Sequence, residues 1–321
     1  MSVGSRPRRG VDIHSFTSSL TGNKESQYLS LTMAQRLCLL LTITAWAGGA
    51  AEQSPYCSFS PEHTLCRASG LGPTCGSQVP ERGVSVKDAA LILTLHNQLR
   101  TRVAMGKESQ GAPGPQPHAA NMRLMVWDDE LATVAQGHAD QCIFRHECID
   151  CRRVKRFAVG QNLYLDKTFN ESKVWKKAIQ TWYGEVSDFS PADIDPYRFS
   201  MSTGHYTQML WGSSYSVGCG FIRFKGGSSW KQLYTCNYGP IGNIKQQKMY
   251  QQGPPCSACP SEVPCSEEYP ALCGVLKRLS AAVDYDYVDN SFNTIPLGRS
   301  SSISGTGLSL VLLFQLMALF L

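Results

Sequence analysis

Two pairs of cysteines in this 321-residue chain are separated by two residues, Cys148 with Cys151 and Cys256 with Cys259. This spacing serves dithiol redox chemistry when it lies on the strand-to-helix turn of a βαβ unit. It also serves zinc binding when four thiolates gather. Neither pair has the βαβ context, so we interpret both as parts of structural disulfides. Zinc binding by the last four cysteines of the chain would need reduced thiolates, which secretion disfavours.

The number of cysteines indicates an oxidising compartment. The chain has thirteen, but Cys38 falls inside an apolar segment that we interpret as a signal peptide, and removing it leaves an even set. We expect these twelve to form six bridges. They are Cys57, Cys66, Cys75, Cys142, Cys148, Cys151, Cys219, Cys236, Cys256, Cys259, Cys265 and Cys273.

Other chemistry is poorly supported by the sequence. No Gly-x-Ser-x-Gly or His-Glu-x-x-His motif occurs, and every cysteine of the mature chain is assigned to a bridge, which argues against a proteolytic enzyme. The formal net charge is only +5, and several of the cations lie in the N-terminal segment that we expect to be removed. This charge is too small to indicate nucleic acid as a partner.

The N-terminal region contains a candidate secretory signal at residues 33–51. One cation, Arg36, precedes an apolar run from Leu37 to Ala47, and small residues follow at 48–51, where a peptidase could cut. A short buried helix is the alternative. Residues 1–32 are polar and aperiodic. We interpret them as a leader before a start at Met33, or as a long n-region of the signal.

The C-terminal residues 308–321 are apolar. As a helix they would rise only about 21 Å, short of the roughly 30 Å hydrocarbon core of a bilayer. Small residues around Ser300 and a Ser/Gly-rich spacer precede them, as in a glycosylphosphatidylinositol (GPI) anchor signal. We therefore expect residues 301–321 to be removed and Ser300 to carry the anchor, with a short tail anchor or a merely apolar terminus as alternatives.

The elements that must position any site lie in residues 85–249. Apolar periodicity predicts a helix over about 86–105, with Ser85 as its N-cap and Gly106 as its stop. A second helix is expected after an Asp128 cap and a third over about 171–189. Strands are expected around 217–224 and 230–238, joined through Gly226 and Gly227.

Two cysteine-rich segments flank this region, an arm at residues 52–84 and a hinge at 250–274. The hinge is too small for a core of its own, so bridges must substitute, at about 2–4 kcal/mol apiece. Residues 275–300 are expected to form a polar stalk. Asn170 begins a glycosylation sequon. The basic run 152–156 is interpreted as a solvated surface, with glycan binding or dibasic cleavage as alternatives.

Two longer motifs indicate the family. Residues 204–211 read GHYTQMLW, residues 233–244 read LYTCNYGPIGNI, and HNQLR occurs at 96–100. Together they resemble the signatures of the CAP superfamily of cysteine-rich secretory, antigen 5 and pathogenesis-related proteins, and the arm resembles the antigen 5 branch. The resemblance implies an α+β fold, a three-layer α-β-α sandwich, with a Cys219–Cys236 bridge. In the hinge it implies bridges from the first cysteine to the third and from the second to the fourth.

The resemblance also implies a cleft lined by His146, Gln161, Glu185 and His205. Two neutral imidazoles suit a borderline metal such as Zn²⁺, and a carboxylate can orient them. Without metal, His and Glu could act as an acid/base pair. Gln161 occupies a position where many relatives have Glu, and an amide neither takes a proton at neutral pH nor carries charge. This departure weakens any mechanism that needs two carboxylates.

The expected function follows from these features together. We expect an extracellular, GPI-anchored, non-enzymatic protein that binds a lipid, another small hydrophobic ligand or an extracellular protein. A metal-dependent hydrolase or redox enzyme that uses the cleft is the alternative, and a soluble secreted component is a third. An apolar groove between helices binds lipids in some relatives; the amphipathic stripes permit one here, but a filled core gives the same pattern. We also expect Cys148 or Cys151 to bridge to Cys66.

Overall fold

The computed structural model describes residues 54–67, 70–167, 173–277 and 279. The signal segment, Asn170, most of the stalk and the anchor signal with Ser300 lie outside these residues. In the part of the chain that is described, no helix is both long enough and apolar enough to cross a membrane.

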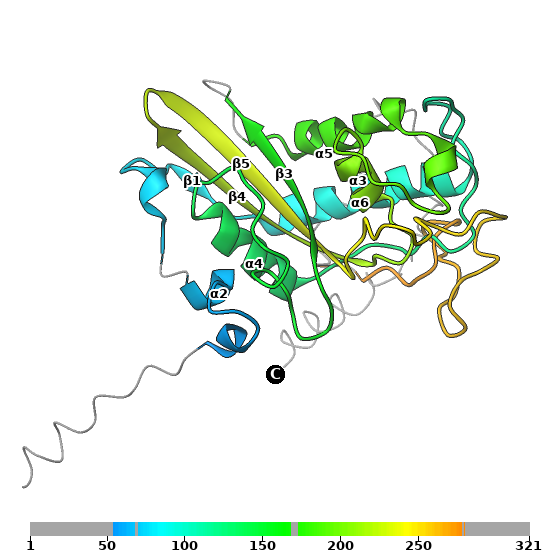
Figure 1. The fold of residues 1–321 in the computed structure, drawn as a ribbon, viewed down its shortest axis with the longest axis horizontal. Helices are drawn as coiled ribbons and strands as arrows, with labels where there is room; N and C mark the ends of the chain where they lie inside the picture. Colours follow the sequence, from blue (N-terminus) through cyan, green and yellow to red (C-terminus); the bar gives the residue numbers. More distant parts are fainter. Residues whose placement is uncertain (1–53, 68–69, 168–172, 278, 280–321) are drawn as a thin grey trace, which may run out of the picture. The chain divides into compact units, whose positions relative to one another are not determined.

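One five-stranded sheet forms the centre of the fold (Figure 1). Its strands run in the order β1–β4–β5–β3, and β2 also pairs with β4. The β2–β4 pairing is parallel and the others are antiparallel. The bounds are β1 Glu81–Arg82, β2 Val126–Trp127, β3 Gly160–Asp166, β4 Ser216–Gly226 and β5 Ser229–Gly239.

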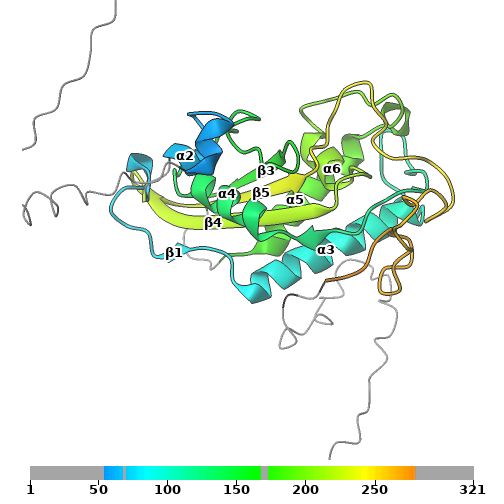
Figure 2. The same cartoon turned by 90° about the horizontal axis from the view of Figure 1, so that it is seen from below.

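Helices cover both faces of the sheet, which confirms the three-layer sandwich (Figures 1 and 2). On one face α4 crosses β4 so closely that a Cβ on Gly218 or Gly220 would come within 2.2 or 2.5 Å of the helix backbone. The opposite face carries α3, α5 and α6. The bounds are α2 Thr64–Arg67, α3 Val86–Ala104, α4 Asp129–Ala139, α5 Trp175–Gly184 and α6 Gly204–Met209, with 3₁₀ turns at Pro55–Ser58, Pro73–Cys75, Glu185–Asp188 and Pro191–Asp193.

The expected helix ends are confirmed for α3 and at the start of α4. Ser85 and Asp88 form a capping box at the start of α3, and Gly106 follows its end with φ of 63°. The Asp128 side chain accepts the N–H of Leu131 and so caps α4. The third expected helix is too long at both ends. It begins at Trp175, and after Gly184 the chain tightens into a 3₁₀ turn.

The amphipathic stripes of α3 and α5 are core rather than an open groove. The inward residues of both helices belong to one cluster that also takes side chains from α6 and from the sheet. Trp175 packs edge-on against Tyr234 of β5, with ring centroids 5.0 Å apart. This burial fixes α5, and therefore Glu185 just beyond it, relative to the sheet.

Six disulfides account for the twelve cysteines. Cys219–Cys236 and the two hinge bridges, Cys256–Cys265 and Cys259–Cys273, have the expected pairing. A further bridge joins Cys75 to Cys142. The expected bridge from Cys66 to the close pair is wrong, because Cys66 pairs with Cys57 and Cys148 pairs with Cys151. The short turns around these two pairs bring each partner within reach locally.

Candidate functional site

His205 and Glu185 form the first half of the candidate cleft. His205 is in the first turn of α6, and Glu185 directly follows α5. Glu185 Oε1 lies 2.6 Å from His205 Nδ1. Its Oε2 accepts the backbone N–H groups of His205 and Tyr206 at 2.8 and 3.0 Å. Because Thr203 provides no side-chain cap, Glu185 satisfies the start of α6 as well as orienting the imidazole.

His146 and Gln161 form the second half. Gln161 is on β3, opposite Asn237 of β5, and its Oε1 lies 3.0 Å from His146 Nδ1. Its Nε2 donates to Glu147 Oε1 at 2.9 Å and to Asn237 Oδ1 at 3.1 Å. Glu147 is not among the residues predicted from the sequence to line the cleft. Its position next to His146 was a signal that could have identified it.

These contacts fix the tautomers of both rings. A carboxylate can only accept a hydrogen bond, so His205 must donate through Nδ1. The amide of Gln161 turns its NH₂ toward Glu147, so its oxygen accepts from Nδ1 of His146. In its neutral form each imidazole therefore keeps the lone pair on Nε2, the atom that a metal or a proton would take.

Burial shifts the pKa values of two residues in the second half of the cleft, His146 and Glu147. His146 is exposed as a residue, but its ring packs among polar neighbours. Desolvation, followed by the charges of Arg152 and His205, lowers its pKa, even though the hydrogen bond to Gln161 acts the other way. Burial raises the pKa of Glu147 against the opposing effects of Thr64 and Arg152. The ring of His146 is therefore held neutral at pH 7.

The structure brings all four expected positions into one region. The Asn162 amide, next to Gln161 on β3, donates to the backbone carbonyl of His205 at 3.0 Å and so ties the two halves together. The set does not form a compact three-ligand metal site. Among the described residues, only Cys256, Cys259 and Cys273 place three such ligand atoms within 4.8 Å of one another.

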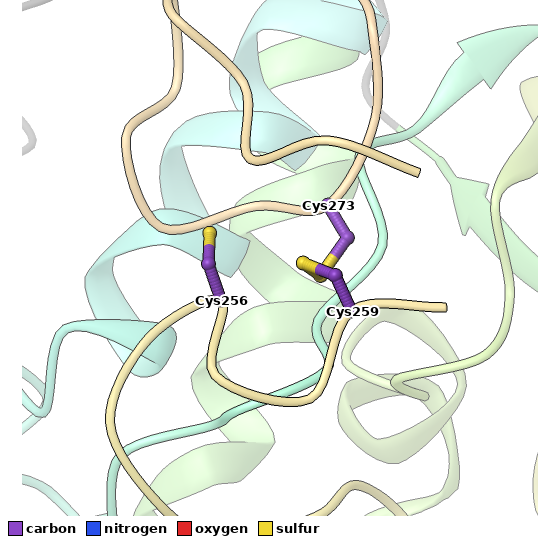
Figure 3. Close-up of side chains that lie close together, drawn as sticks. All are labelled: Cys256, Cys259 and Cys273. Carbon is purple, nitrogen blue, oxygen red and sulfur yellow. A yellow bond between two sulfur atoms is a disulfide. The ribbon is translucent and has the colours of Figure 1, made fainter. Parts of the chain in front are cut away.

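That cysteine trio is not a metal site. Figure 3 shows Cys259 bonded to Cys273, and Cys256 is bonded to Cys265. Disulfide sulfurs are not thiolates, so they do not ligate zinc. Among the described residues of the cleft, the donors that suit a borderline metal such as Zn²⁺ are the Nε2 atoms of His146 and His205.

A cavity of about 450 Å³ lies beside this cleft. Its walls come from the arm helix α2 and from residues 138–151. It touches His146 and Glu147 but neither His205 nor Glu185. The cavity therefore shares His146 with the cleft and extends away from the half formed by Glu185 and His205.

The basic run 152–156 is solvated as expected at Arg153, Lys155 and Arg156, which are exposed, but not at Arg152. Arg152 is buried and donates to the carbonyl oxygens of Glu147 and Val159 at 2.6 and 2.8 Å. Arg156 binds Asp128 and Glu130. Arg152 and Arg156 hold the loop in place, because the guanidinium of each donates hydrogen bonds to other groups of the chain.

Exposed aromatic residues lie near both histidines in the sequence. Phe144, two residues before His146, is 54% exposed, and Phe199 is 44% exposed. The Phe199 ring lies against Gly204, the residue before His205: a Cβ placed there would be 3.2 Å from the ring. Both rings are available to an apolar ligand.

Comparisons with known proteins agree with this fold. Residues 93–238 match the CAP family, described as the cysteine-rich secretory protein family. The chain is 43% identical to a CRISP/Allergen/PR-1 protein of Trittame loki over 73% of this chain and 59% of that protein. It is 40% identical to venom allergen 5.02 of Dolichovespula maculata over 63% of this chain and 96% of that protein. It spans under three fifths of the length of several longer relatives, 58% for venom allergen 5 of Tityus serrulatus.

Comparison with solved structures also identifies CAP-type proteins as similar in fold. The crystal structure of Na-ASP-1 aligns with a TM-score of 0.50 at 30% identity, over 64% of this chain and 51% of that one. The structure of BmVAL-1 aligns with a TM-score of 0.51 at 24% identity, over 63% of this chain and all of that one, and supports the fold alone. The chain belongs to the CAP family, among its venom allergen-like proteins.

Proposed function

We propose that this chain is a secreted, GPI-anchored CAP protein whose cleft binds a lipid or another small hydrophobic ligand and does not catalyse a reaction. One observation carries the non-enzymatic part. The four cleft positions supply a single carboxylate, Glu185, and its two oxygens already accept three hydrogen bonds from His205 and Tyr206. A hydrolase of the two-carboxylate kind would need a second acid. Gln161 cannot serve as one, and the neighbouring carboxylate of Glu147 already accepts hydrogen bonds from Thr64 and Gln161.

The proposed ligand surface is the pair of exposed rings beside the histidines, Phe144 and Phe199. Burying one such ring against an apolar ligand contributes about 1.5–3 kcal/mol. The stripes of α3 and α5 are already buried in the core, so an apolar ligand would need a surface such as this one. An extracellular protein that presents an apolar segment is the competing occupant.

The ligand proposal is tested with a fluorescent fatty acid and the double variant Phe144→Ser/Phe199→Ser. Binding should weaken at least about tenfold, as expected when ring contacts of this size are lost. Val275→Ser is the matched control, because Val275 is also exposed, at 64%, but directly follows the hinge and is not part of the cleft. Unchanged affinity in the double variant would place the ligand elsewhere.

The anchor is tested on cells that display the full chain. A phosphatidylinositol-specific phospholipase should release the protein into the medium, because it cuts the lipid from a GPI anchor. A chain that stops at Ser300 is the control and should appear in the medium without treatment. Retention of the full chain on treated cells would overturn this part of the proposal.

The alternative function is a metal-dependent hydrolase or redox enzyme. His146 and His205 would hold the metal through Nε2, and a bound Zn²⁺ would supply Lewis-acid chemistry there. The purified protein would then contain metal, and His205→Ala would lose both metal and activity. Full metal content in His205→Ala would exclude this function.

A further inference from the structure

The Cys148–Cys151 bridge differs from the other five in the chain length that it closes. Its cysteines are three residues apart, whereas the other separations run from 9 to 67. A bridge restrains the unfolded chain less as its loop shortens. Opening this bridge should therefore cost little fold stability.

The bridge is also accessible. Cys148 is exposed. Both cysteines of the bridge, Cys148 and Cys151, line the cavity of about 450 Å³ between α2 and residues 138–151. By contrast, Cys75, Cys142, Cys219 and Cys236 are all less than 5% exposed. A thiol that enters the cavity can therefore reach the Cys148–Cys151 bridge but not the Cys75–Cys142 or Cys219–Cys236 bridge.

The backbone around the bridge suits thiol exchange. The N–H of Cys151 donates to Cys148 Sγ at 3.0 Å. The Arg152 guanidinium donates to the carbonyl oxygens of Glu147 and Cys148 at 2.6 and 3.2 Å, which places a cation at this turn. The N–H donor favours thiolate over thiol at Cys148, the sulfur that leaves when a mixed disulfide at Cys148 is resolved, and the nearby cation favours a thiolate at this turn.

The cavity carries charges of both signs. Arg67 and Arg145 line it together with Glu62 and Glu147. Arg67 and Glu62 pair with each other at an exposed position, with side chains 64% and 60% exposed. Such a pair contributes little and can exchange for the charges of a ligand. A small peptide thiol carries carboxylates, an ammonium group and a sulfur, and matches this lining.

We propose that the cavity binds a low-molecular-weight peptide thiol and that Cys148–Cys151 exchanges with it. The thiolate of the peptide attacks Cys148 Sγ, a mixed disulfide forms, the Cys148–Cys151 bond breaks, and Cys151 leaves as a thiolate that takes up a proton. A second peptide thiolate then attacks the peptide sulfur of the mixed disulfide, which releases the oxidised peptide and a thiolate at Cys148. This site goes beyond the proposed cleft.

Exchange at this bridge would act on the arm. The backbone N–H of Thr64 donates to the carbonyl oxygen of Cys151 at 2.8 Å, and the Thr64 hydroxyl donates to Glu147. Glu147 in turn holds Gln161. The redox state of the pair is thereby connected to the arm on one side and to the cleft on the other.

The test uses the folded, oxidised protein with reduced glutathione, followed by alkylation and mass spectrometry. Cys148 should carry the glutathione adduct, and Cys148–Cys151 should open at least about tenfold faster than Cys256–Cys265, whose Cys265 is also exposed. The proposal fails if Cys256–Cys265 opens first, or if no bridge opens before the protein unfolds.

Charge recognition is tested separately with Arg145→Gln. This variant should slow the reaction with glutathione about three- to fivefold, the range of an exposed ion pair, and leave the reaction with neutral 2-mercaptoethanol unchanged. Arg198→Gln, at an exposed arginine paired with Asp193, is the matched control. Equal slowing with both thiols, or none with either, would refute binding of a charged peptide thiol.

Discussion

Glu185 Oε1 lies 2.6 Å from His205 Nδ1, while the other oxygen of the same carboxylate accepts the N–H of His205. One side chain thus holds a cleft histidine by its ring and by its backbone. At the opposite end of α6, the buried guanidinium of Arg100 donates to the carbonyl oxygens of Met209 and Trp211 at 2.7 and 3.0 Å. A helix of six residues is too short to be stable alone, so α6 depends on an anion at its start and a cation at its end.

Removing the anion should destabilise the fold. Glu185→Ala leaves the N–H groups of His205 and Tyr206 without their acceptor, and we expect the free energy of unfolding to fall by about 2 kcal/mol, the scale of hydrogen bonds to charged groups. Urea denaturation at pH 7 measures this loss. Asp188→Ala, in the same 3₁₀ turn but exposed, is the control and should change little. Equal effects of the two variants would contradict the capping role.

Removing the cation should cost more. Arg100 is fully buried, and burial lowers its pKa to about 9, so it remains charged at pH 7. Arg100→Ala strands several buried carbonyl groups, and we expect it to lose about 3–5 kcal/mol, as when one partner of a buried charged network is removed. Arg198→Ala, at an exposed arginine, should lose less than about 1 kcal/mol. A small loss at Arg100 in thermal and urea denaturation would contradict this account.

Acid should destabilise the protein through its buried histidines. His96 is fully buried, and desolvation lowers its pKa from 6.5 to about 4. Below pH 6.5 His96 is protonated in the unfolded chain, whereas in the folded chain it is protonated only below about pH 4. The contribution of neutral His96 to the free energy of unfolding is therefore full above pH 6.5. It falls by about 3 kcal/mol as the pH drops from 6.5 to 4. His138 and His146 shift in the same direction.

The measurement is urea denaturation from pH 7 to pH 4.5. The raised pKa of Glu147 acts oppositely, because the folded chain then binds more protons above pH 4.5 than the unfolded one. In His96→Gln the slope of the free energy of unfolding against pH on the acid side should decrease by the equivalent of up to one bound proton, whatever the stability of the variant at pH 7. An unchanged slope in this variant would show that His96 does not cause the acid loss.

How far the sequence predicts the structure depends on whether the signal is local. The ends of α3 follow from neighbouring residues, Ser85 with Asp88 and then Gly106, so periodicity and capping predict them. The strand β3 was not predicted, because its exposure does not alternate and its pairing with β5 is long-range. The bridge partner of Cys66 was also missed, since the pairing of cysteines depends on the fold of the arm rather than on spacing.

The candidate site divides in the same way. His146, Gln161, Glu185 and His205 were identified by resemblance, and the structure places them in one region. Glu147 was missed because its role depends on a side-chain contact that crosses from the loop to β3. That contact gives a physical reason for the amide at position 161. A carboxylate there would face the carboxylate of Glu147 across 2.9 Å.

Exchanging these two side chains tests that reason. Gln161→Glu alone should lower stability at pH 7, because two carboxylates so close together cannot both be charged without a large cost, and acidification to pH 5 should relieve the loss. The double variant Gln161→Glu/Glu147→Gln restores one carboxylate and one amide. In this double variant the carboxylate is the group that accepts the hydrogen bond from Nδ1 of His146, and a carboxylate in that place makes the ring a better metal ligand.

We therefore expect the double variant to recover wild-type stability and to bind Zn²⁺ about tenfold more tightly than the wild type, the lower end of the range for such orienting partners. Urea denaturation and competition with a chromophoric chelator measure the two quantities. Glu147→Gln alone is the control, since it removes the charge without placing one on the histidine, and it should not tighten zinc binding. If Gln161→Glu is as stable as the wild type at pH 7, Glu147 does not determine the residue at position 161.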